Sequence, residues 1–350
     1  MSALKRIDGR QKELIDSIVL EFPFKHEKIS PAILEKDFLI RDVIHTIMGS
    51  GSEEARLIFC GGTCLSMGHG IIDRMSEDID FKVVTPPDMG TSQRDRTLSA
   101  FKKAVIKKLE DSGLWLIPDS LRARNSNGYI TANFGYESVF GEIPQSLRPE
   151  IKIEFTANPP HGECNSLALI PTADRMMTKM GGVPEGKTYP ITCLGLEETA
   201  AEKVISYLRR TAQERAGLGR GDYDSYLVRH FYDLHQIMNS GCFTFLDCLR
   251  LFEKIVDLDR HQFGRQFMEF QTCPFVVLET ERRYLKNDSS SRESYNQKLI
   301  PLVWGDRPSF EMAVSTFDDL AERLLAPFWI EELSSVQDIS GKPKVPEPGM

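Results

Sequence analysis

The sequence predicts an α+β fold, a mixed sheet with helices followed by an all-helical region, because apolar residues follow two different periods. Up to about residue 195, short apolar runs and alternating segments of strand length are interspersed with helical patterns. From Leu196 onward the spacing is helical throughout. The 350 residues are also enough for two packed domains. We therefore expect an α+β domain over 1–195, a helical domain over 196–335 and a Pro-rich disordered tail over 336–350.

The expected elements follow from local patterns of apolar residues. Proline ends the first helix in the stretch EFPF. Apolar residues at helical spacing predict helices over 10–21, 31–48, 92–112, 198–210, 223–239, 243–256, 275–286 and 308–325. Strands are expected over 57–60, 79–84, 114–117, 129–136, 151–156 and 166–170.

Composition narrows the class of protein. A net charge of −8 argues against a surface built for general nucleic-acid binding, although one local basic face remains compatible with it. The seven cysteines include no CxxC pair, which favours reduced thiols in a cytosol over a disulfide framework or a zinc site. No run approaches the length of a membrane span, and the N-terminus lacks the apolar region of a signal peptide. We expect a cytoplasmic protein that has no membrane partner.

An acidic stretch, SEDID (76–80), stands directly before the apolar residues of an expected strand. Because side chains two residues apart share one face of a strand, Asp78 and Asp80 would point the same way and Ile79 and Phe81 into the core. Two neighbouring carboxylates repel each other, and a divalent cation turns that cost into binding energy. Oxygen ligands of this kind suit magnesium.

Two further segments supply the other groups that a metal–phosphate site needs. PEIKIEF (149–155) places Glu154 and Lys152 on one face of another expected strand, where Glu154 can supply a third carboxylate. Gly61-Gly62-Thr63 lies at an expected strand-to-helix turn, where backbone amides bind anions, and Ser76 can add a hydroxyl. Taken singly, each acid is also compatible with a solvated turn and the glycine pair with any loop. Their order along the chain favours a site for a metal–nucleoside triphosphate.

The block GGTCLSMGHGIIDRMSEDIDF (61–81) resembles the GGTxL…RxSEDIDF signature of the AbiEii/AbiGii-type nucleotidyltransferase toxin family, in the polymerase-β-like nucleotidyltransferase superfamily. ILEKDFLIRDVI, IKIEF and LEETAAEKVISYLRR are similar to further motifs of that family, and they occur in the same order. The resemblance runs from about Ile33 to Leu234. It implies a polymerase-β-like nucleotidyltransferase domain with a mixed sheet, followed by a helical C-terminal domain that completes the active site.

The resemblance also implies the role of each site residue. The triphosphate would be bound by Gly61, Gly62, Thr63 and Ser76, and two magnesium ions by Asp78, Asp80 and Glu154. Glu154 would also accept a proton from the attacking hydroxyl. Lys203 would neutralise charge on the nucleotide as pyrophosphate leaves, and Asp233 lies in VRHFYDLHQI, which looks like the last catalytic helix of the family.

Several of these residues have an ordinary structural interpretation. Lys203 could be a solvated lysine, but its apolar neighbours predict a buried helix in which it needs an anion. Asp233 could form a helix-face ion pair with Arg229, four residues earlier. His230 departs from the family pattern, which has an aspartate there, and this leaves the role of the position open. We expect Glu35-Lys36-Asp37 to be a structural hydrogen-bonding cluster near the site, and His69 to pack beside the site or support its residues rather than take part in catalysis.

The resemblance implies transfer of a nucleoside monophosphate from a nucleoside triphosphate to a hydroxyl acceptor, with release of pyrophosphate. Some family members modify the 3′ end of tRNA, and members act as toxins of toxin–antitoxin or phage-defence systems, so an antitoxin partner is implied. Two alternatives remain: transfer to a small hydroxylated molecule such as an antibiotic, or an inactive nucleotide-binding module. RNA binding would need basic patches, and the candidates are Arg209, Arg210, Arg215, Arg220 and Arg229, and Lys102, Lys103, Lys107 and Lys108.

Overall fold

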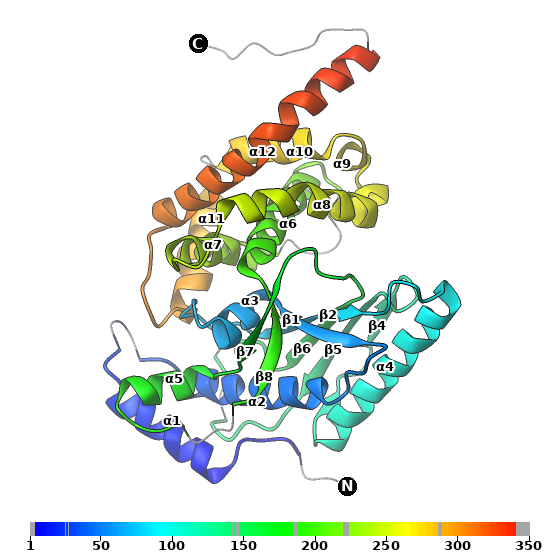
Figure 1. Cartoon of the computed structure of the whole chain (residues 1–350). Coiled ribbons are helices and arrows are strands. Elements are labelled where there is room, and N and C mark those ends of the chain that lie inside the picture. The colour runs from blue at the N-terminus through cyan, green and yellow to red at the C-terminus, as the bar shows by residue number, and fades with distance from the viewer. Residues whose placement is uncertain are drawn as a thin grey trace. The chain divides into compact units, whose positions relative to one another are not determined.

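The structure, a computed structural model, describes residues 4–24, 26, 28–141, 143–144, 147–184, 188–219, 224–285 and 289–340, the last six by their backbone alone. Contacts divide the chain into two compact units. The first contains Met1–Gly195 and Ile300–Arg307, and the second contains Leu196–Leu299 and Pro308–Met350. The first unit carries the sheet and the second is helical (Figure 1). The α+β class predicted from the sequence is thus confirmed.

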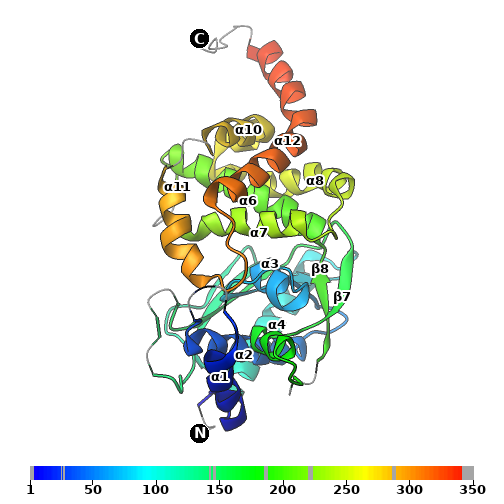
Figure 2. The same cartoon turned by 90° about the vertical axis from the view of Figure 1, so that its left-hand side faces the viewer.

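The sheet of the first unit has eight strands among the described residues, in the order β3-β5-β6-β2-β1-β8-β7, with β4 paired to β5 beside this path. It is mixed, as predicted, because β2 pairs with β6 and β1 with β8 in parallel while the other pairs are antiparallel. Figure 2 shows the antiparallel pair β7 and β8 at one edge. The strands are β1 Arg56–Cys60, β2 Asp78–Val84, β3 Trp115–Leu116, β4 Arg122–Arg124, β5 Tyr129–Gly135, β6 Ile151–Thr156, β7 Cys164–Ala168 and β8 Pro190–Leu194.

One face of this sheet is apolar and covered by a helix. Ile79 and Phe81 on β2 are fully buried, as their alternation with the two aspartates predicted. Helix α4 (Thr91–Asp111) packs on this face, with the ring of Phe101 edge-on to that of Phe155 at 5.1 Å between centroids. Since successive side chains of a strand alternate between faces, the polar residues of β2 and β6 are left on the opposite face.

The first two helices of the first unit, α1 and α2, begin and end near the predicted residues. Asp8 caps α1 (Gly9–Glu21) by accepting from the amide of Gln11, and α2 (Pro31–Met48) begins at a proline, which lacks the amide hydrogen that a first turn leaves unpaired. Helix α5 (Thr172–Lys179) and strand β8 are absent from the prediction because each is short and bounded by residues without a clear apolar period. The glycine turn opens α3 (Gly61–Thr63), which continues into a π-helical turn, Cys64–Gly68.

Helix α2 carries three charged side chains in succession, all of them buried. Glu35 accepts hydrogen bonds from the Ser138 hydroxyl and the Val139 amide. Asp37 accepts from both the amide and the hydroxyl of Thr172, at 2.6 and 2.9 Å. The expected structural hydrogen-bonding cluster is confirmed, and Asp37 joins α2 to the start of α5.

Burial raises the pKa of Asp37 to about 6, although the positive charge of Arg175 opposes the shift. Because the folded-state pKa lies above that of the unfolded chain, the folded protein binds the extra proton, and stability falls as pH rises from about 4 to 6. We expect this group to reduce the free energy of unfolding by about 2–3 kcal/mol over that range. Urea denaturation of wild type and Asp37→Asn between pH 4 and 7 measures the difference. The same dependence of the free energy of unfolding on pH in the two proteins would contradict this prediction.

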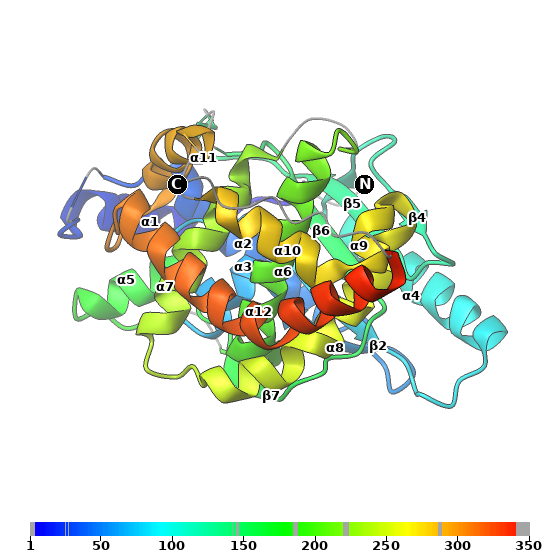
Figure 3. The same cartoon turned by 90° about the horizontal axis from the view of Figure 1, so that it is seen from above.

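The second unit is a set of helices packed around aromatic side chains. Tyr207 contacts Phe231 and Phe317, with ring centroids 4.6 and 5.2 Å away, and all three are buried. Figure 3 shows α12 crossing α7 and α10, against which it packs. The helices are α6 Leu196–Arg215, α7 Arg229–Asn239, α8 Phe245–Phe263, α9 Met268–Thr272, α10 Pro274–Tyr284, α11 Ser289–Ser294 and α12 Phe310–Ser340, with shorter turns at Ser225–Val228, Gly264–Gln266 and Tyr295–Leu299.

Between the turn Tyr295–Leu299 and α12, the chain returns to the first unit for the segment Ile300–Arg307. The amide of Met75 donates to the carbonyl of Leu302, and the amide of Trp304 donates to the carbonyl of Asp73, both at 3.0 Å. This segment therefore fixes the backbone immediately before SEDID. The sequence placed these residues in the helical domain, because a paired segment this short has no apolar period of its own.

Helix α12 continues to Ser340, whereas the sequence predicted a disordered tail from residue 336. The helix crosses this boundary because no glycine or proline occurs between Pro327, which lies within α12, and Gly341. The remainder of the predicted tail, 341–350, lies outside the described residues. None of the helices that the structure describes is long and apolar enough to cross a membrane.

Candidate active site

The three predicted acids lie on two adjacent strands. Strand β2 pairs in parallel with β6, and the register places Asp80 opposite Glu154 and Asp78 opposite Lys152. In-register residues of neighbouring strands lie about 5 Å apart and share one face of the sheet. The four side chains are partly buried on the face away from α4, whereas their neighbours Ile79 and Ile153 are buried. The parallel pairing of β2 with β6 therefore places the two aspartates and Glu154 on one face of the sheet.

The glycine turn contacts this acidic face directly. Gly61 has φ +77°, and a Cβ at this position would overlap the carboxylate of Asp80. A Cβ at Gly62 would lie 2.6 Å from the Ser76 hydroxyl oxygen. Both positions thus exclude a side chain, Gly61 through backbone conformation and crowding and Gly62 through crowding alone. The predicted phosphate-binding residues and the predicted metal ligands meet at this turn.

Thr63 connects the turn to the acidic strand. Its buried hydroxyl donates to the carbonyls of Ser76 and Asp78, at 3.3 and 2.5 Å. The side chain that the resemblance assigned to the nucleotide therefore bonds to the protein backbone. It holds the SEDID segment against α3, which sets the position from which the two aspartates project.

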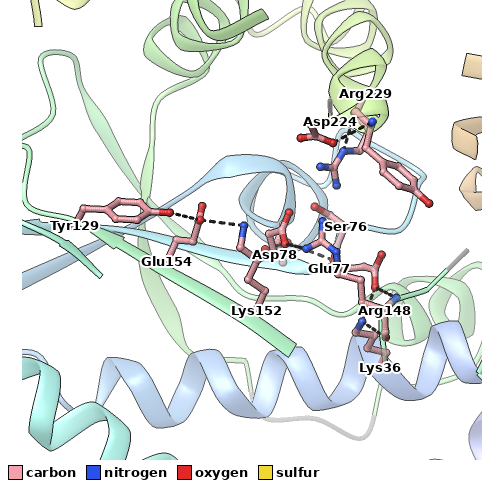
Figure 4. A network of polar contacts seen from close by, with 12 residues as sticks. Lys36, Ser76, Glu77, Asp78, Tyr129, Arg148, Lys152, Glu154, Asp224 and Arg229 are labelled. Atoms are coloured by element: carbon pink, nitrogen blue, oxygen red, sulfur yellow. Dashed lines mark hydrogen bonds and ion pairs between the residues drawn. The ribbon is translucent and has the colours of Figure 1, made fainter. Parts of the chain in front are cut away.

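Asp78 is neutralised by an arginine that the sequence analysis did not identify. The guanidinium of Arg148, in the segment before β6, forms an ion pair with the Asp78 carboxylate. The adjacent Glu77 forms a separate ion pair with Lys36 of α2 at 2.5 Å, and also accepts from the Arg148 amide at 2.7 Å. Figure 4 shows this network beside the acidic strand. Lys36 thus reaches from α2 to the residue that precedes the first aspartate.

Glu154 has two hydrogen-bond donors. The Tyr129 hydroxyl donates to its Oε1 at 2.6 Å, and Lys152 lies 2.9 Å from the same oxygen (Figure 4). Burial, followed by the negative charge of Glu154, raises the pKa of the Tyr129 phenol, so the phenol remains protonated and donates. Burial lowers the pKa of Lys152, but the negative charges of Asp78 and Glu154 outweigh burial and raise it. Glu154 is therefore held by a charged lysine and a neutral phenol.

The donor set suits a hard divalent cation, because three carboxylates occupy one face of neighbouring strands beside a glycine turn. Arg148 and Lys152 supply positive charge to two of these acids, Asp78 and Glu154, and so stand in for a cation. Within the part of the chain that the structure describes, no three His, Cys, Asp or Glu side chains are gathered closely enough to hold a metal ion. A divalent cation at Asp78 or Glu154 would compete with these two ion pairs.

Lys203 and Asp233, the two predicted site residues of the second unit, are paired with each other. The ammonium of Lys203 on α6 lies 2.7 Å from the carboxylate of Asp233 on α7, and both residues are buried. The prediction that Lys203 lies on a buried helix is confirmed. The anion that its ammonium contacts is the carboxylate of Asp233. Nearby, His230 Nδ1 has no hydrogen-bond partner among the described residues, and burial together with the charge of Lys203 lowers the pKa of this imidazole well below its ordinary value.

The candidate basic patches are largely occupied by internal contacts. Arg209 is buried, with its guanidinium on Asp259 and over the ring of Phe263. Arg215 pairs with Glu281, and Arg210 pairs with Asp224. On α4, Lys102, Lys107 and Lys108 contact Asn127, Asp111 and the carbonyl of Gly49 respectively, and Arg220 lies outside the described residues. Arg209, Arg210 and Arg215 are thus paired with acids of the protein itself, whereas Lys102 and Lys108 bond to neutral groups.

Sequence analysis did not identify Tyr129 and Arg148, and it assigned Lys36 and Glu77 no contact with the acidic strand. Tyr129 begins an expected strand, but only the pairing of β5 with β6 reveals that it faces Glu154. Arg148 lies in a segment without any apolar period, so no local pattern marks it. His69, expected to pack beside the site or support its residues, bonds through Nε2 to the carbonyl of Leu194 at 2.8 Å.

Comparison with known proteins places this site in a family. The family model described as "Nucleotidyl transferase AbiEii toxin, Type IV TA system" matches residues 48–323. Among solved structures, MenT4, a nucleotidyltransferase toxin from Mycobacterium tuberculosis H37Rv, is similar in fold, with a TM-score of 0.50, 16% identity and 92% of each chain covered.

A c-di-GMP synthase, the STING-associated CdnE from Capnocytophaga granulosa, aligns with a TM-score of 0.24 and 8% identity over 91% of this chain and 87% of its own, which is too low to support an inference. No curated protein matches the chain. The family match spans the glycine turn, the acidic strand, β6 and the Lys203–Asp233 pair, and it confirms the resemblance found in the sequence. This chain is a nucleotidyltransferase that belongs to the AbiEii toxin family of type IV toxin–antitoxin systems.

Proposed function

We propose that this nucleotidyltransferase transfers a nucleoside monophosphate from a magnesium–nucleoside triphosphate to RNA, at the 3′ end of tRNA, and acts as a toxin restrained by a cognate antitoxin. The observation that carries the proposal is the acidic face of β2 and β6, where Asp80 lies opposite Glu154 and packs over Gly61. A carboxylate cluster beside a glycine turn supports the binding of phosphates together with a cation.

The proposal assigns a role to each residue of the acidic face and of the glycine turn. Gly61, Gly62 and Ser76 bind the triphosphate, and Asp78, Asp80 and Glu154 hold magnesium. Magnesium would supply positive charge against the charge that develops on the phosphates during transfer. In the second unit, the proposal assigns Lys203 to the leaving pyrophosphate and Asp233 to holding the Lys203 ammonium in place, as their ion pair already does.

The hydrogen bond between Tyr129 and Glu154 supports the role of Glu154 as proton acceptor. At 2.6 Å, Glu154 Oε1 already accepts from a hydroxyl, which is the kind of group that must be deprotonated when it attacks the α-phosphate. The oxygen of the acceptor would form a bond to phosphorus while the bond to pyrophosphate breaks. The acceptor's proton would pass to Glu154.

The second candidate for the acceptor is a small hydroxylated molecule. It is favoured by the ion pairs that the arginines of the second unit form with acids of the protein. RNA binding depends on neutralising phosphates, and Arg209 and Arg215 already neutralise acids of the protein itself. The net charge of −8 would instead attract a cationic acceptor such as an aminoglycoside.

Labelling of RNA tests the proposal. Purified protein would be incubated with magnesium, each α-labelled nucleoside triphosphate in turn and total RNA. We expect label in a tRNA-sized band, and a loss of roughly a thousandfold in Asp78→Asn, because a metal ligand is removed. Asp16→Asn makes the same change in an exposed ion pair with Lys12 and should label normally. Label in aminoglycosides but in no RNA would support the second candidate, and undiminished labelling by Asp78→Asn would contradict both.

A further inference from the structure

The backbone of Arg148 accepts and donates one hydrogen bond each, and its side chain forms an ion pair. Its amide donates to Glu77 at 2.7 Å, and its carbonyl accepts from the Lys36 ammonium at 2.8 Å. Its guanidinium forms the ion pair with Asp78. Because the two backbone contacts do not involve the side chain, the backbone of Arg148 stays in place whatever the guanidinium binds.

The two residues that hold this backbone form a buried ion pair. The Lys36 side chain has no exposed surface and that of Glu77 is 9% exposed, with 2.5 Å between the charged atoms. Removing one partner of such a pair leaves an unpaired buried charge, so the pair is rigidly retained. Lys36 belongs to α2 and Glu77 to the SEDID segment, so the Arg148 backbone is fixed to the same segment that positions Asp78.

The ion pair of the Arg148 guanidinium with Asp78, in contrast, is partly exposed to solvent. The side chain of Arg148 is 34% exposed and that of Asp78 is 17% exposed, so solvent weakens their attraction. A divalent cation has twice the charge of a guanidinium and binds the same carboxylate oxygens. A guanidinium displaced from a carboxylate is well suited to phosphate, because its planar set of donors matches both groups.

We propose that Arg148 is a positioning residue with two successive partners: it holds Asp78 while no divalent cation is bound, and it binds the phosphates of the nucleotide once a cation occupies Asp78. This inference rests on the proposed function, since it needs a cation and a nucleotide at the acidic face. In the absence of a cation, Arg148 keeps the Asp78 carboxylate neutralised and oriented. It also couples the arrival of metal to the capture of nucleotide.

Binding of manganese, measured by electron paramagnetic resonance without nucleotide, tests the first half of the inference. We expect Arg148→Gln to lower the half-saturating manganese concentration about three- to tenfold, because the competing positive charge is gone. The backbone contacts to Lys36 and Glu77 remain in this variant. Arg41→Gln is the matched control, because Arg41 pairs with Asp42 outside the site at similar exposure, and it should leave manganese binding unchanged.

Binding of a non-hydrolysable triphosphate in the presence of saturating manganese tests the second half. Arg148→Gln should weaken nucleotide affinity about tenfold, and Arg148→Lys, which keeps the charge, should recover part of it. Unchanged or weaker manganese binding in Arg148→Gln, or unchanged nucleotide affinity, would overturn the inference. Asp78→Asn separates this result from a failure of the proposed function: if that variant binds manganese as wild type does, the proposed metal site itself is wrong.

Discussion

Replacement of Gly61 by alanine is expected to reduce nucleotidyl transfer by about a thousandfold. A Cβ at Gly61 would overlap the carboxylate of Asp80, so this acid has to move off the face it shares with Glu154. Loss of a positioned carboxylate that holds a metal removes several kcal/mol of charge stabilisation, and each ~1.4 kcal/mol corresponds to a tenfold change in rate. Measurement of kcat/KM with the labelled nucleotide gives the loss directly.

Gly141 provides a matched control for this prediction. Its φ is also +77°, but a Cβ there would meet no atom within 4 Å. Alanine at either position carries the strain of a left-handed backbone, about 1–2 kcal/mol, whereas only the alanine at position 61 displaces a site residue. We expect Gly141→Ala to keep transfer within about twofold of wild type. Equal losses of transfer in the two variants would assign the effect to backbone strain and contradict the role given to Asp80.

Replacement of Lys203 by methionine is expected to lower the free energy of unfolding by about 3–5 kcal/mol, because it removes the cationic partner of the buried Asp233 carboxylate. Both partners are buried and only 2.7 Å apart, so water cannot replace the lost contact. Urea denaturation followed by circular dichroism measures the change.

An exposed ion pair of the same length is the control for Lys203. Lys12 and Asp16 also lie 2.7 Å apart, but their side chains are 47% and 53% exposed. Lys12→Met should therefore cost no more than about 0.5 kcal/mol. The double variant Lys203→Met with Asp233→Leu removes both buried charges, and we expect it to be more stable than Lys203→Met alone. Equal costs for Lys203→Met and Lys12→Met would show that the Lys203–Asp233 pair does not stabilise the second unit.

Local pattern in the sequence was sufficient for the features that depend on a few neighbouring residues. Asp78 and Asp80 share a face opposite Ile79 and Phe81 because the side chains of a strand have a period of two, and this alternation is visible in the sequence itself. The longer helices were predicted within a few residues, apart from the ends of α7, α8 and α12, because their apolar residues follow a period of 3.6. The glycine turn was identified because only glycine accepts both its backbone conformation and such close contact.

The sequence by itself thus determined the α+β class, the acidic strand and the family motif that marks this chain as a nucleotidyltransferase. Tertiary structure decided which residues face one another: Glu154 opposite Asp80, Arg148 on Asp78, and Lys203 on Asp233. It also decided the return of Ile300–Arg307 to the first unit. These contacts join residues 30 to more than 200 positions apart, and their partners are fixed by strand register and by the pairing of buried charges, neither of which leaves a local period in the chain.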